Sequence, residues 1–341
     1  MNNLKIAIIG FGNAARAFCK ILINKDKDIR QNYQLAPIIT AVATNTRGNL
    51  VLESGLNLEQ IVNMNNFFNH PNYSNLSTNE IIEKTNYDVM IELTPLNIES
   101  GQPAISYITK AMKRHKHVIT ANKGPLAHAY KNLKQLSEDM NVHFLYETTV
   151  MDGTPIFNLV EDTLPYCKVL GFEGILNTTT NYILTEMEKG LSKEKALENG
   201  RSLGFVEANP RNDLEGHDAA AKVAVLANVL MNQTIKPKDV LTEGIENISL
   251  EDVQKVSKAN NKLKLLCKAN ITNNEFKAEV KLQELPNNHP LATIKGTSSA
   301  LTLKTDLMKD ITIIENDPEI NQTGFGIFSD LIRLIKSIQE S

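Results

Sequence analysis

The sequence contains no tryptophan, only three cysteines and no long hydrophobic run. Cys19, Cys167 and Cys267 are odd in number and far apart, so they predict neither a disulfide framework nor a zinc-binding cluster. No stretch approaches the roughly 18 consecutive apolar residues of a membrane helix, and the apolar run at residues 6–9 is too short for a signal peptide. These absences favour a cytoplasmic protein without a membrane partner.

An excess of charge of one sign is also absent. The 36 lysines and arginines stand against 39 aspartates and glutamates, and the net charge of −3 gives no reason to expect a nucleic acid partner. A hydrophobic content of 42% is typical of a globular protein, and 341 residues suffice for two domains.

A glycine-rich turn follows the first predicted strand, residues 4–9, and opens a helix expected to end near Leu22. Its pattern is G-x-G-x-x-A, in which Gly10 permits a tight turn, Gly12 lets a pyrophosphate approach the backbone and Ala15 keeps the helix close to the strand. An ordinary glycine-rich turn is the alternative. The residues expected to contact a dinucleotide are Gly10, Phe11, Gly12, Asn13 and Ala14.

The second predicted strand, residues 38–43, ends in Thr44-Asn45-Thr46-Arg47. An NAD site often carries Asp or Glu at this place for the ribose hydroxyls, whereas an arginine suits the 2′-phosphate of NADP. Thr44 and Arg47 are therefore cofactor candidates that favour NADP over NAD. A solvated loop arginine is the competing interpretation of Arg47.

Strands and helices alternate through the rest of this half. Strands are predicted at residues 88–93, 117–120 and 142–146, and helices at 101–114 and 126–140. This alternation predicts an α/β fold with a Rossmann-type, doubly wound parallel sheet. Because ligands bind outside the carboxyl ends of such strands, Thr94, Pro95 and Lys123 are site candidates.

Polar groups follow two further strand ends. Glu147 precedes a turn whose carbonyls, together with its carboxylate, could hold a cation; a carboxylate that caps a helix N-terminus is the alternative. A strand at residues 169–176 leads into hydroxyls and amides at residues 177–181, and helices are expected at 182–189 and 192–202.

The segment at residues 203–227 collects carboxylates, glycines and a lysine before a very apolar helix. Residues 209–216 are predicted as a loop, and a helix follows from His217 or Asp218 to about Met231. Asp218 and Lys222 are four residues apart and share a helix face. A lysine that opens a buried helix can act as an acid or base near neutral pH, whereas an exposed Asp–Lys pair is the simpler alternative.

The C-terminal part is predicted to be rich in β-strands between residues 261 and 317. Apolar and polar residues alternate at 276–285 and 300–303. Antiparallel strands here predict an α+β domain whose sheet can bury a face against a partner subunit. An amphipathic helix at residues 324–338 is expected to fold back on the first domain. The predicted domains are 1–146 with 318–341, for the dinucleotide, and 147–317, for substrate and dimerisation.

Five motifs in this order resemble those of homoserine dehydrogenases. The motifs are Val118–Lys123 (V-x-T-A-N-K), Glu147–Ile156, Gly174–Leu184, Leu203–Lys222 (L-G-F-x-E ending in D-A-x-x-K) and Leu285–Ala292. Asn209, Thr178 and Thr148 depart from the usual family residues. The resemblance covers nearly the whole chain and is to the short form, in which neither an ACT domain nor an aspartate kinase is expected.

The resemblance implies reversible oxidation of L-homoserine to L-aspartate 4-semialdehyde with NAD or NADP, in threonine, methionine and isoleucine biosynthesis. The β-rich segment at residues 261–317 suggests a homodimer formed through paired sheets. The resemblance implies that Lys222 and Lys123 are the catalytic lysines. The substrate residues that it implies are Glu207, Asp218, Asp213, Thr179 and Gly204. It also implies a Na⁺ or K⁺ site formed by Glu147, Val150, Asp152 and Thr154. A further cofactor contact is expected at Gly324.

Two other interpretations compete with this one. A different semialdehyde dehydrogenase would need a nucleophilic cysteine, and none of the three cysteines stands in a convincing site. A nucleotide-binding sensor without catalysis could share the fold, because fold does not determine function.

Overall fold

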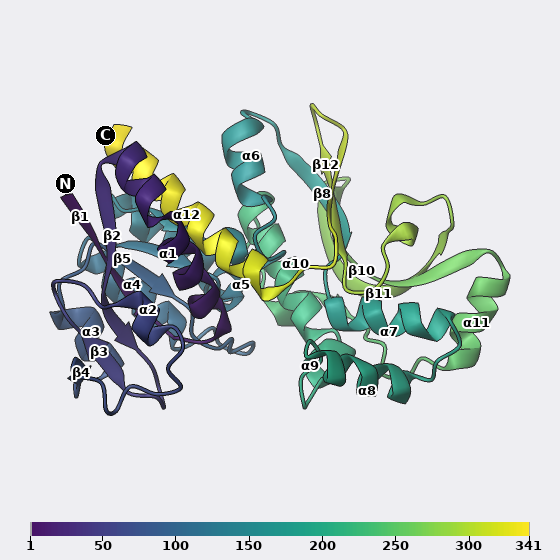
Figure 1. Cartoon of the computed structure of the whole chain (residues 1–341). Coiled ribbons are helices and arrows are strands. Elements are labelled where there is room, and N and C mark those ends of the chain that lie inside the picture. The colour runs from purple at the N-terminus through teal and green to yellow at the C-terminus, as the bar shows by residue number, and fades with distance from the viewer. Residues whose placement is uncertain (1, 341) are drawn as a thin grey trace. The chain divides into compact units, whose positions relative to one another are not determined.

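The computed structural model describes residues 2–340 and divides into two compact units (Figure 1). Unit 1 contains the chain up to Pro125, then Ala129–Asn158, and the C-terminal part from Glu319. Unit 2 contains Leu126–His128 and Leu159–Pro318. Unit 1 therefore extends past residue 146, where the sequence predicts the domain boundary.

Unit 1 is built on a seven-stranded sheet with the order β4-β3-β2-β1-β5-β6-β7. Its strands are β1 Asn2–Ile9, β2 Leu35–Ala43, β3 Asn49–Val51, β4 Tyr73–Ser74, β5 Val89–Glu92, β6 His117–Thr120 and β7 Phe144–Leu145. The pairs from β2 to β7 are parallel, which confirms the predicted Rossmann-type sheet. The antiparallel edge strands β3 and β4 were not predicted, because each is only two or three residues long.

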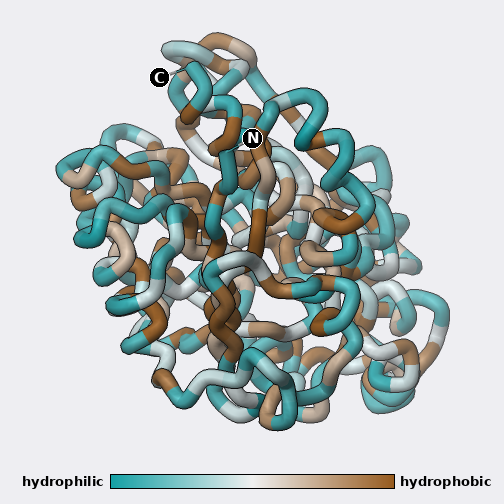
Figure 2. The backbone as a smooth tube through the Cα atoms, turned by 60° about the vertical axis from the view of Figure 1, so that its left-hand side comes forward, coloured by the Kyte–Doolittle hydropathy of each residue, from teal (hydrophilic) through white to brown (hydrophobic). Residues whose placement is uncertain are grey.

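The strands of unit 1 form its hydrophobic core. Ile6 and Ile8 of β1 are completely buried, as are Val89 and Ile91 of β5. In Figure 2 the tube turns brown, the colour of hydrophobic residues, as the chain enters β1 after the N-terminus. Strands buried on both faces in this way are typical of a parallel sheet covered by helices.

The helices of unit 1 differ from the predictions mainly at their ends. They are α1 Asn13–Tyr33, α2 Leu58–Ile61, α3 Thr78–Lys84, α4 Ala104–Lys113, α5 Lys123–Asp139 and α12 Ile320–Glu340, while α6 Phe157–Thr163 begins at its boundary. The predicted end of α1 near Leu22 is wrong, since the helix continues and buries Ile29. Helix α12 begins four residues earlier than predicted, so Gly324 lies inside the helix and does not open it.

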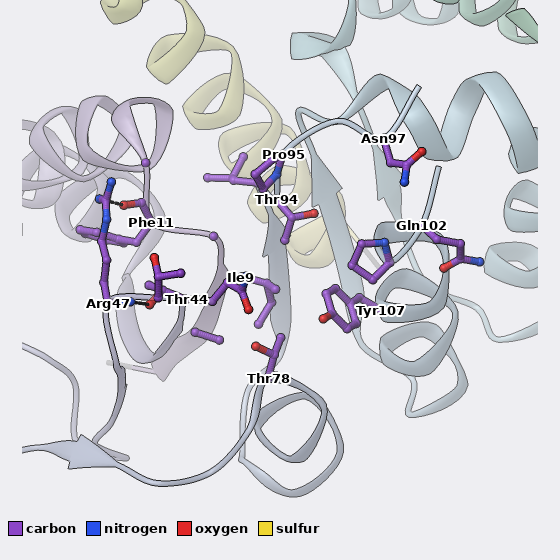
Figure 3. Close-up of a pocket in the computed structure, with 17 residues that line it drawn as sticks. Ile9, Phe11, Thr44, Arg47, Thr78, Thr94, Pro95, Asn97, Gln102 and Tyr107 are labelled. Carbon is purple, nitrogen blue, oxygen red and sulfur yellow. Dashed lines mark hydrogen bonds between the residues drawn. The ribbon is translucent and has the colours of Figure 1, made fainter. Parts of the chain in front are cut away.

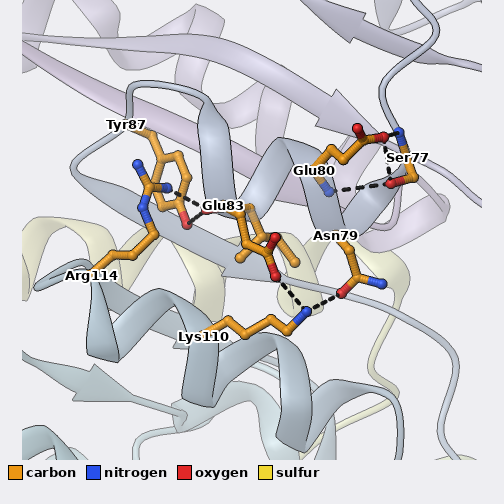
Figure 4. Close-up of polar contacts among 8 residues, drawn as sticks. Ser77, Asn79, Glu80, Glu83, Tyr87, Lys110 and Arg114 are labelled. Carbon is orange, nitrogen blue, oxygen red and sulfur yellow. Dashed lines mark hydrogen bonds and ion pairs between the residues drawn. The ribbon is translucent and has the colours of Figure 1, made fainter.

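Polar contacts join α3 to α4 (Figure 4). Ser77 and Glu80 form a capping box at the start of α3, which satisfies two backbone N–H groups. The Nζ of Lys110 donates to Glu83 Oε1 at 2.6 Å and to Asn79 Oδ1 at 2.8 Å. The contacts of Lys110 therefore reach both ends of α3 from α4.

Unit 2 contains a six-stranded sheet with the order β13-β12-β8-β10-β11-β9. The strands are β8 Val169–Ile175, β9 Leu241–Thr242, β10 Asn261–Thr272, β11 Glu275–Pro286, β12 Ser299–Thr305 and β13 Asp310–Glu315. All neighbours are antiparallel except β9 and β11, so the predicted second sheet is confirmed.

The helices of unit 2 include α7 Thr178–Glu188, α8 Lys193–Leu203, α9 Arg211–Leu214, α10 His217–Leu230 and α11 Leu250–Lys258. The predicted loop at residues 209–216 is wrong in part, because α9 forms one turn within it. Helix α7 begins four residues before the predicted start, because Asn177 caps it by accepting the N–H of Thr180. Within residues 2–340, no helix has the length and apolar character needed to cross a bilayer.

Candidate active site

The glycine turn after β1 has the geometry of a dinucleotide loop. Gly10 has a φ of +95°, and a Cβ there would lie 2.4 Å from the carbonyl oxygen of Leu93, so a larger residue would not fit. Around Gly12 nothing lies within 4 Å of an added Cβ, so the backbone is open to a ligand. Helix α1 begins directly after Gly12 without a side-chain cap, which leaves its first N–H groups available to a phosphate.

A cavity of about 520 Å³ opens over this turn (Figure 3). Seven of the predicted cofactor residues line it, namely Gly10, Phe11, Gly12, Thr44, Arg47, Thr94 and Pro95. The lining also includes residues that sequence analysis missed, among them Thr78, Asn97, Gln102, Pro103 and Tyr107. Its position at the carboxyl ends of β1, β2 and β5 fits a dinucleotide bound across the sheet.

Arg47 lies over the glycine turn in this cavity (Figure 3). Its Nη1 donates to the carbonyl oxygen of Phe11 at 3.1 Å. The hydroxyl of Thr44 accepts the backbone N–H of Arg47 at 2.9 Å and donates to Gly48 at 2.8 Å. No carboxylate is among the residues that line the cavity. The positive charge of Arg47 is therefore not offset by a negative charge in the lining, which suits a bound phosphate.

The other predicted cofactor residues lie outside the lining of the cavity. Asn13 and Ala14 form the first turn of α1, and Lys123 is the first residue of α5. Gly324 is buried in α12, where an added Cβ would lie 2.7 Å from Ala17 of α1. Its glycine character is explained by close packing of two helices.

Unit 2 brings Lys222 together with two carboxylates. The Nζ of Lys222 donates to the carbonyl oxygen of Leu176 at 2.6 Å. The amide of Asn177 donates to Asp213 Oδ1 at 2.7 Å and to Asp218 Oδ2 at 3.2 Å. Four side chains from three segments thus converge at the carboxyl end of β8. We call Asn177, Asp213, Asp218 and Lys222 the lysine cluster.

Electrostatics couple the two carboxylates of the lysine cluster. Burial raises the pKa of Asp213, and the neighbouring charge of Asp218 raises it further. Hydrogen bonds from Asn177 and Thr179, together with the charge of Lys222, oppose this rise. Such opposing effects on one carboxyl group are common at functional sites.

The remaining substrate candidates differ in exposure, with Thr179 buried and both Gly204 and Glu207 exposed. Thr179 is buried in the first turn of α7 and contacts Asp213. Gly204 ends α8 in the left-handed conformation with a φ of +89°, which accounts for glycine there without a ligand. Glu207 lies exposed on the turn that follows.

The structure places Glu147 as a helix cap. Its Oε1 accepts the N–H groups of Ile156 and Phe157 at 2.6 and 3.0 Å, and its Oε2 accepts that of Asn158 at 2.7 Å. These contacts favour the capping interpretation of the sequence. Asp152 Oδ1 accepts the hydroxyl of Thr323 at 2.6 Å. Residues 2–340 contain no group of three His, Cys, Asp or Glu side chains arranged for a metal.

Two of the three cysteines, Cys19 and Cys267, are buried. Burial raises the pKa of Cys19 and of Cys267 to about 12, so neither is a thiolate near neutral pH. All three cysteines are free of disulfide bonds. Neither buried thiol therefore suits a dehydrogenase that forms a thioester.

Sequence analysis missed the central position of Asn177. The available signal was its place between a strand and a helix, which is typical of an N-cap. Its second function, holding Asp213 and Asp218, depends on residues 36 and 41 positions away. No local pattern reports such contacts.

The parallel sheet with its glycine turn and the lysine cluster are those of an NAD(P)-dependent oxidoreductase. Residues 10–147 match the model described as "Homoserine dehydrogenase, NAD binding domain", and residues 155–332 match the one described as "Homoserine dehydrogenase". The chain belongs to the homoserine dehydrogenase family.

Similar proteins support the assignment over the full length. A homoserine dehydrogenase of Methanocaldococcus jannaschii is 35% identical, with 99% of this chain and 100% of the relative covered. An NAD(+)-dependent homoserine dehydrogenase of Pseudomonas canavaninivorans is 33% identical over 99% of this chain and 97% of its own. The crystal structure of the S. aureus enzyme has a TM-score of 0.80 and 28% identity, over 99% of this chain and 78% of that one.

Proposed function

We propose that the protein interconverts L-homoserine and L-aspartate 4-semialdehyde, with NADP or NAD as the hydride carrier, in the biosynthesis of threonine, methionine and isoleucine. The observation that carries the proposal is the lysine cluster, in a chain that also holds a dinucleotide cavity. When bound, the cofactor supplies or accepts the hydride. The protein supplies placement, charge and the proton.

Lys222 is the proposed acid and base. Its Nζ is fixed by the carbonyl of Leu176, and its ammonium group can donate a proton to the aldehyde oxygen as negative charge develops there. In the oxidation direction the same nitrogen receives the proton from the hydroxyl group. Lys123, at the start of α5, is the proposed second lysine, which polarises this oxygen.

Asp213 and Asp218 are the proposed carboxylates that shape the polar side of the substrate site, and Glu207 is proposed to bind the substrate ammonium group. Asn177 supports this arrangement because one amide holds both aspartates. Thr179 and Gly204 are the remaining proposed substrate contacts. Unit 1 is proposed as the cofactor domain and unit 2 as the substrate and dimerisation domain.

For the cofactor we propose a preference for NADP. The support is the pair Thr44 and Arg47 in a cavity whose lining carries no carboxylate. A relative named as NAD(+)-dependent is similar over nearly the whole chain, so both cofactors belong in the test.

A homodimer formed through the sheet of unit 2 is also proposed. Exposed apolar side chains on and beside its strands support it, namely Leu170, Leu307, Met308 and Ile314. A Na⁺ or K⁺ ion bound by carbonyls of Val150, Asp152 and Thr154 near Glu147, and a cytoplasmic location, are further proposals. Light scattering at several concentrations tests the dimer, and rates in sodium, potassium and tetramethylammonium chloride test the ion.

The test of the main proposal is turnover of homoserine and of the semialdehyde, followed by the absorbance of reduced nicotinamide. We expect turnover in both directions and no activity with serine or threonine. Absence of turnover with either cofactor, in a protein that still binds dinucleotide, would favour a sensor.

A further inference from the structure

Glu92 is a completely buried carboxyl group at the carboxyl end of β5. Its Oε1 accepts the backbone N–H of Thr94 at 2.8 Å and also the Thr94 hydroxyl, and its Oε2 accepts the hydroxyl of Thr120 at 2.8 Å. No ion pair in the described chain involves it. Burying a carboxyl group is costly unless hydrogen bonds compensate, so its presence in an otherwise apolar strand requires an explanation.

The hydrogen bonds continue from Glu92 to the start of α5. The hydroxyl of Thr120 accepts the backbone N–H of Asn122 at 3.0 Å, and the amide of Asn122 donates to the carbonyl oxygen of Thr94 at 3.1 Å. Asn122 also caps α5 by accepting the N–H of Gly124 at 3.0 Å. We call Glu92, Thr94, Thr120 and Asn122 the Glu92 network.

This network touches two parts of the proposed machinery within unit 1. Thr94 and Pro95 line the dinucleotide cavity (Figure 3). On its other side, the cap at Asn122 directly precedes Lys123, the first residue of α5. The carboxyl group of Glu92 does not line the cavity itself.

Sheet formation does not require this carboxyl group. Backbone pairing already joins β5 to β6 from Val89 with His117 to Glu92 with Thr120, and an apolar side chain would fill the space at lower cost. Burial raises the pKa of Glu92, while its hydroxyl and amide donors lower it. The network therefore costs stability but fixes the positions of the residues at the ends of β5 and β6.

We propose that Glu92 is a positioning residue for hydride transfer. Its hydrogen bonds fix the position of the Thr94 turn, which faces the cofactor, relative to Lys123 at the start of α5. The inference rests on the proposed function. Glu92 acts through Thr94, Thr120 and Asn122, since its own side chain is enclosed.

The first test is Glu92→Gln, which keeps the size of the side chain. It replaces one of the two accepting carboxylate oxygens by an NH₂ group, which cannot accept a hydrogen bond from Thr94 or Thr120. Displacement of reacting groups by less than an ångström is expected to lower kcat by about 10- to 100-fold. The matched control is Tyr87→Phe, because Tyr87 is equally buried and its hydroxyl donates only to Ile82 at 2.9 Å. The control should lose thermal stability but keep kcat.

A double-mutant cycle with Lys123→Ala separates positioning from general destabilisation. If Glu92 acts through Lys123, the loss caused by Glu92→Gln should shrink to about threefold or less in the Lys123→Ala background. Strictly additive losses, or a folded Glu92→Gln protein with parental kcat, would overturn the inference. Should Glu92→Gln fail to fold, Thr120→Val removes one donor of the network and is expected to show a smaller loss in the same direction; parental kcat in that variant would equally overturn the inference.

Dinucleotide affinity gives a readout that does not depend on turnover. Titration of intrinsic NADPH and NADH fluorescence is expected to show about 3- to 10-fold weaker binding to Glu92→Gln, and unchanged binding to Tyr87→Phe. If the parent did not oxidise homoserine, the proposed function would fail, while this affinity difference would still decide the role of Glu92. Parental affinity in the folded variant would count against it.

Discussion

The dinucleotide cavity of unit 1 and the lysine cluster of unit 2 are built in different ways. The cavity is shaped by backbone, since a Cβ at Gly10 would collide with the Leu93 carbonyl group and the space around Gly12 is open. The cluster is shaped by side chains that hold each other, with Asn177 between Asp213 and Asp218. A backbone site is sensitive to added atoms, whereas a side-chain site is sensitive to removed ones. Mutations of opposite kinds should therefore break the two regions.

The largest effect is expected from Lys222→Ala in the cluster. Loss of the proposed acid should lower kcat by about 10²- to 10⁴-fold, while cofactor affinity stays within about twofold because the cavity is untouched. Steady-state kinetics together with fluorescence titration provide the check. Near-normal turnover would remove Lys222 from the mechanism.

Glycine substitutions sharpen the contrast on the cavity side. Gly12→Ala should keep its melting temperature, because nothing lies within 4 Å of the new Cβ, yet weaken dinucleotide binding by about tenfold or more. Gly10→Ala should lose both binding and stability, because its Cβ would meet Leu93 at 2.4 Å and φ is +95°. Equal melting temperatures for the two variants would contradict this steric account.

Asn177→Ala tests whether the cluster depends on side-chain support. Removing the amide leaves two carboxylates without their common donor, which costs about 1–3 kcal/mol of stability and should lower kcat/KM for homoserine about tenfold. The control is Asn228→Ala, a buried asparagine of unit 2 that holds the carbonyl groups of Leu126 and Ile235. If both variants lost activity equally, Asn177 would have no special link to catalysis.

The smallest effect is expected from Arg47→Ala, because a side chain is being removed from a site formed mainly by backbone. Loss of one charged contact from this exposed side chain should raise the KM for NADP about three- to fivefold and leave that for NAD nearly unchanged. Kinetics with both cofactors measure the ratio. An equal change in KM for NADP and NAD would show that Arg47 only stabilises the loop, through its hydrogen bond to Phe11.

Prediction from sequence succeeded where the signal was local. The hydrophobic strands, the glycine turn and the spacing of Asp218 and Lys222 depend on neighbours within one or two turns, and the parallel sheet followed from strand and helix alternation. The errors arose where tertiary packing or a very short element decided the structure. Gly324 resembles a loop glycine, but contact with Ala17 explains it, and the single turn α9 is too short to leave a periodic signal.

The sequence by itself determined which residues form the glycine turn and which lysine lies in the buried helix, because backbone conformation and helix periodicity are encoded in adjacent residues. Only the tertiary structure decided that Asn177 donates hydrogen bonds to two aspartates and that the buried Glu92 accepts hydrogen bonds from Thr94 and Thr120. Those contacts join residues from separate strand ends and helices, and they exist only once the order of strands in each sheet has made these ends neighbours.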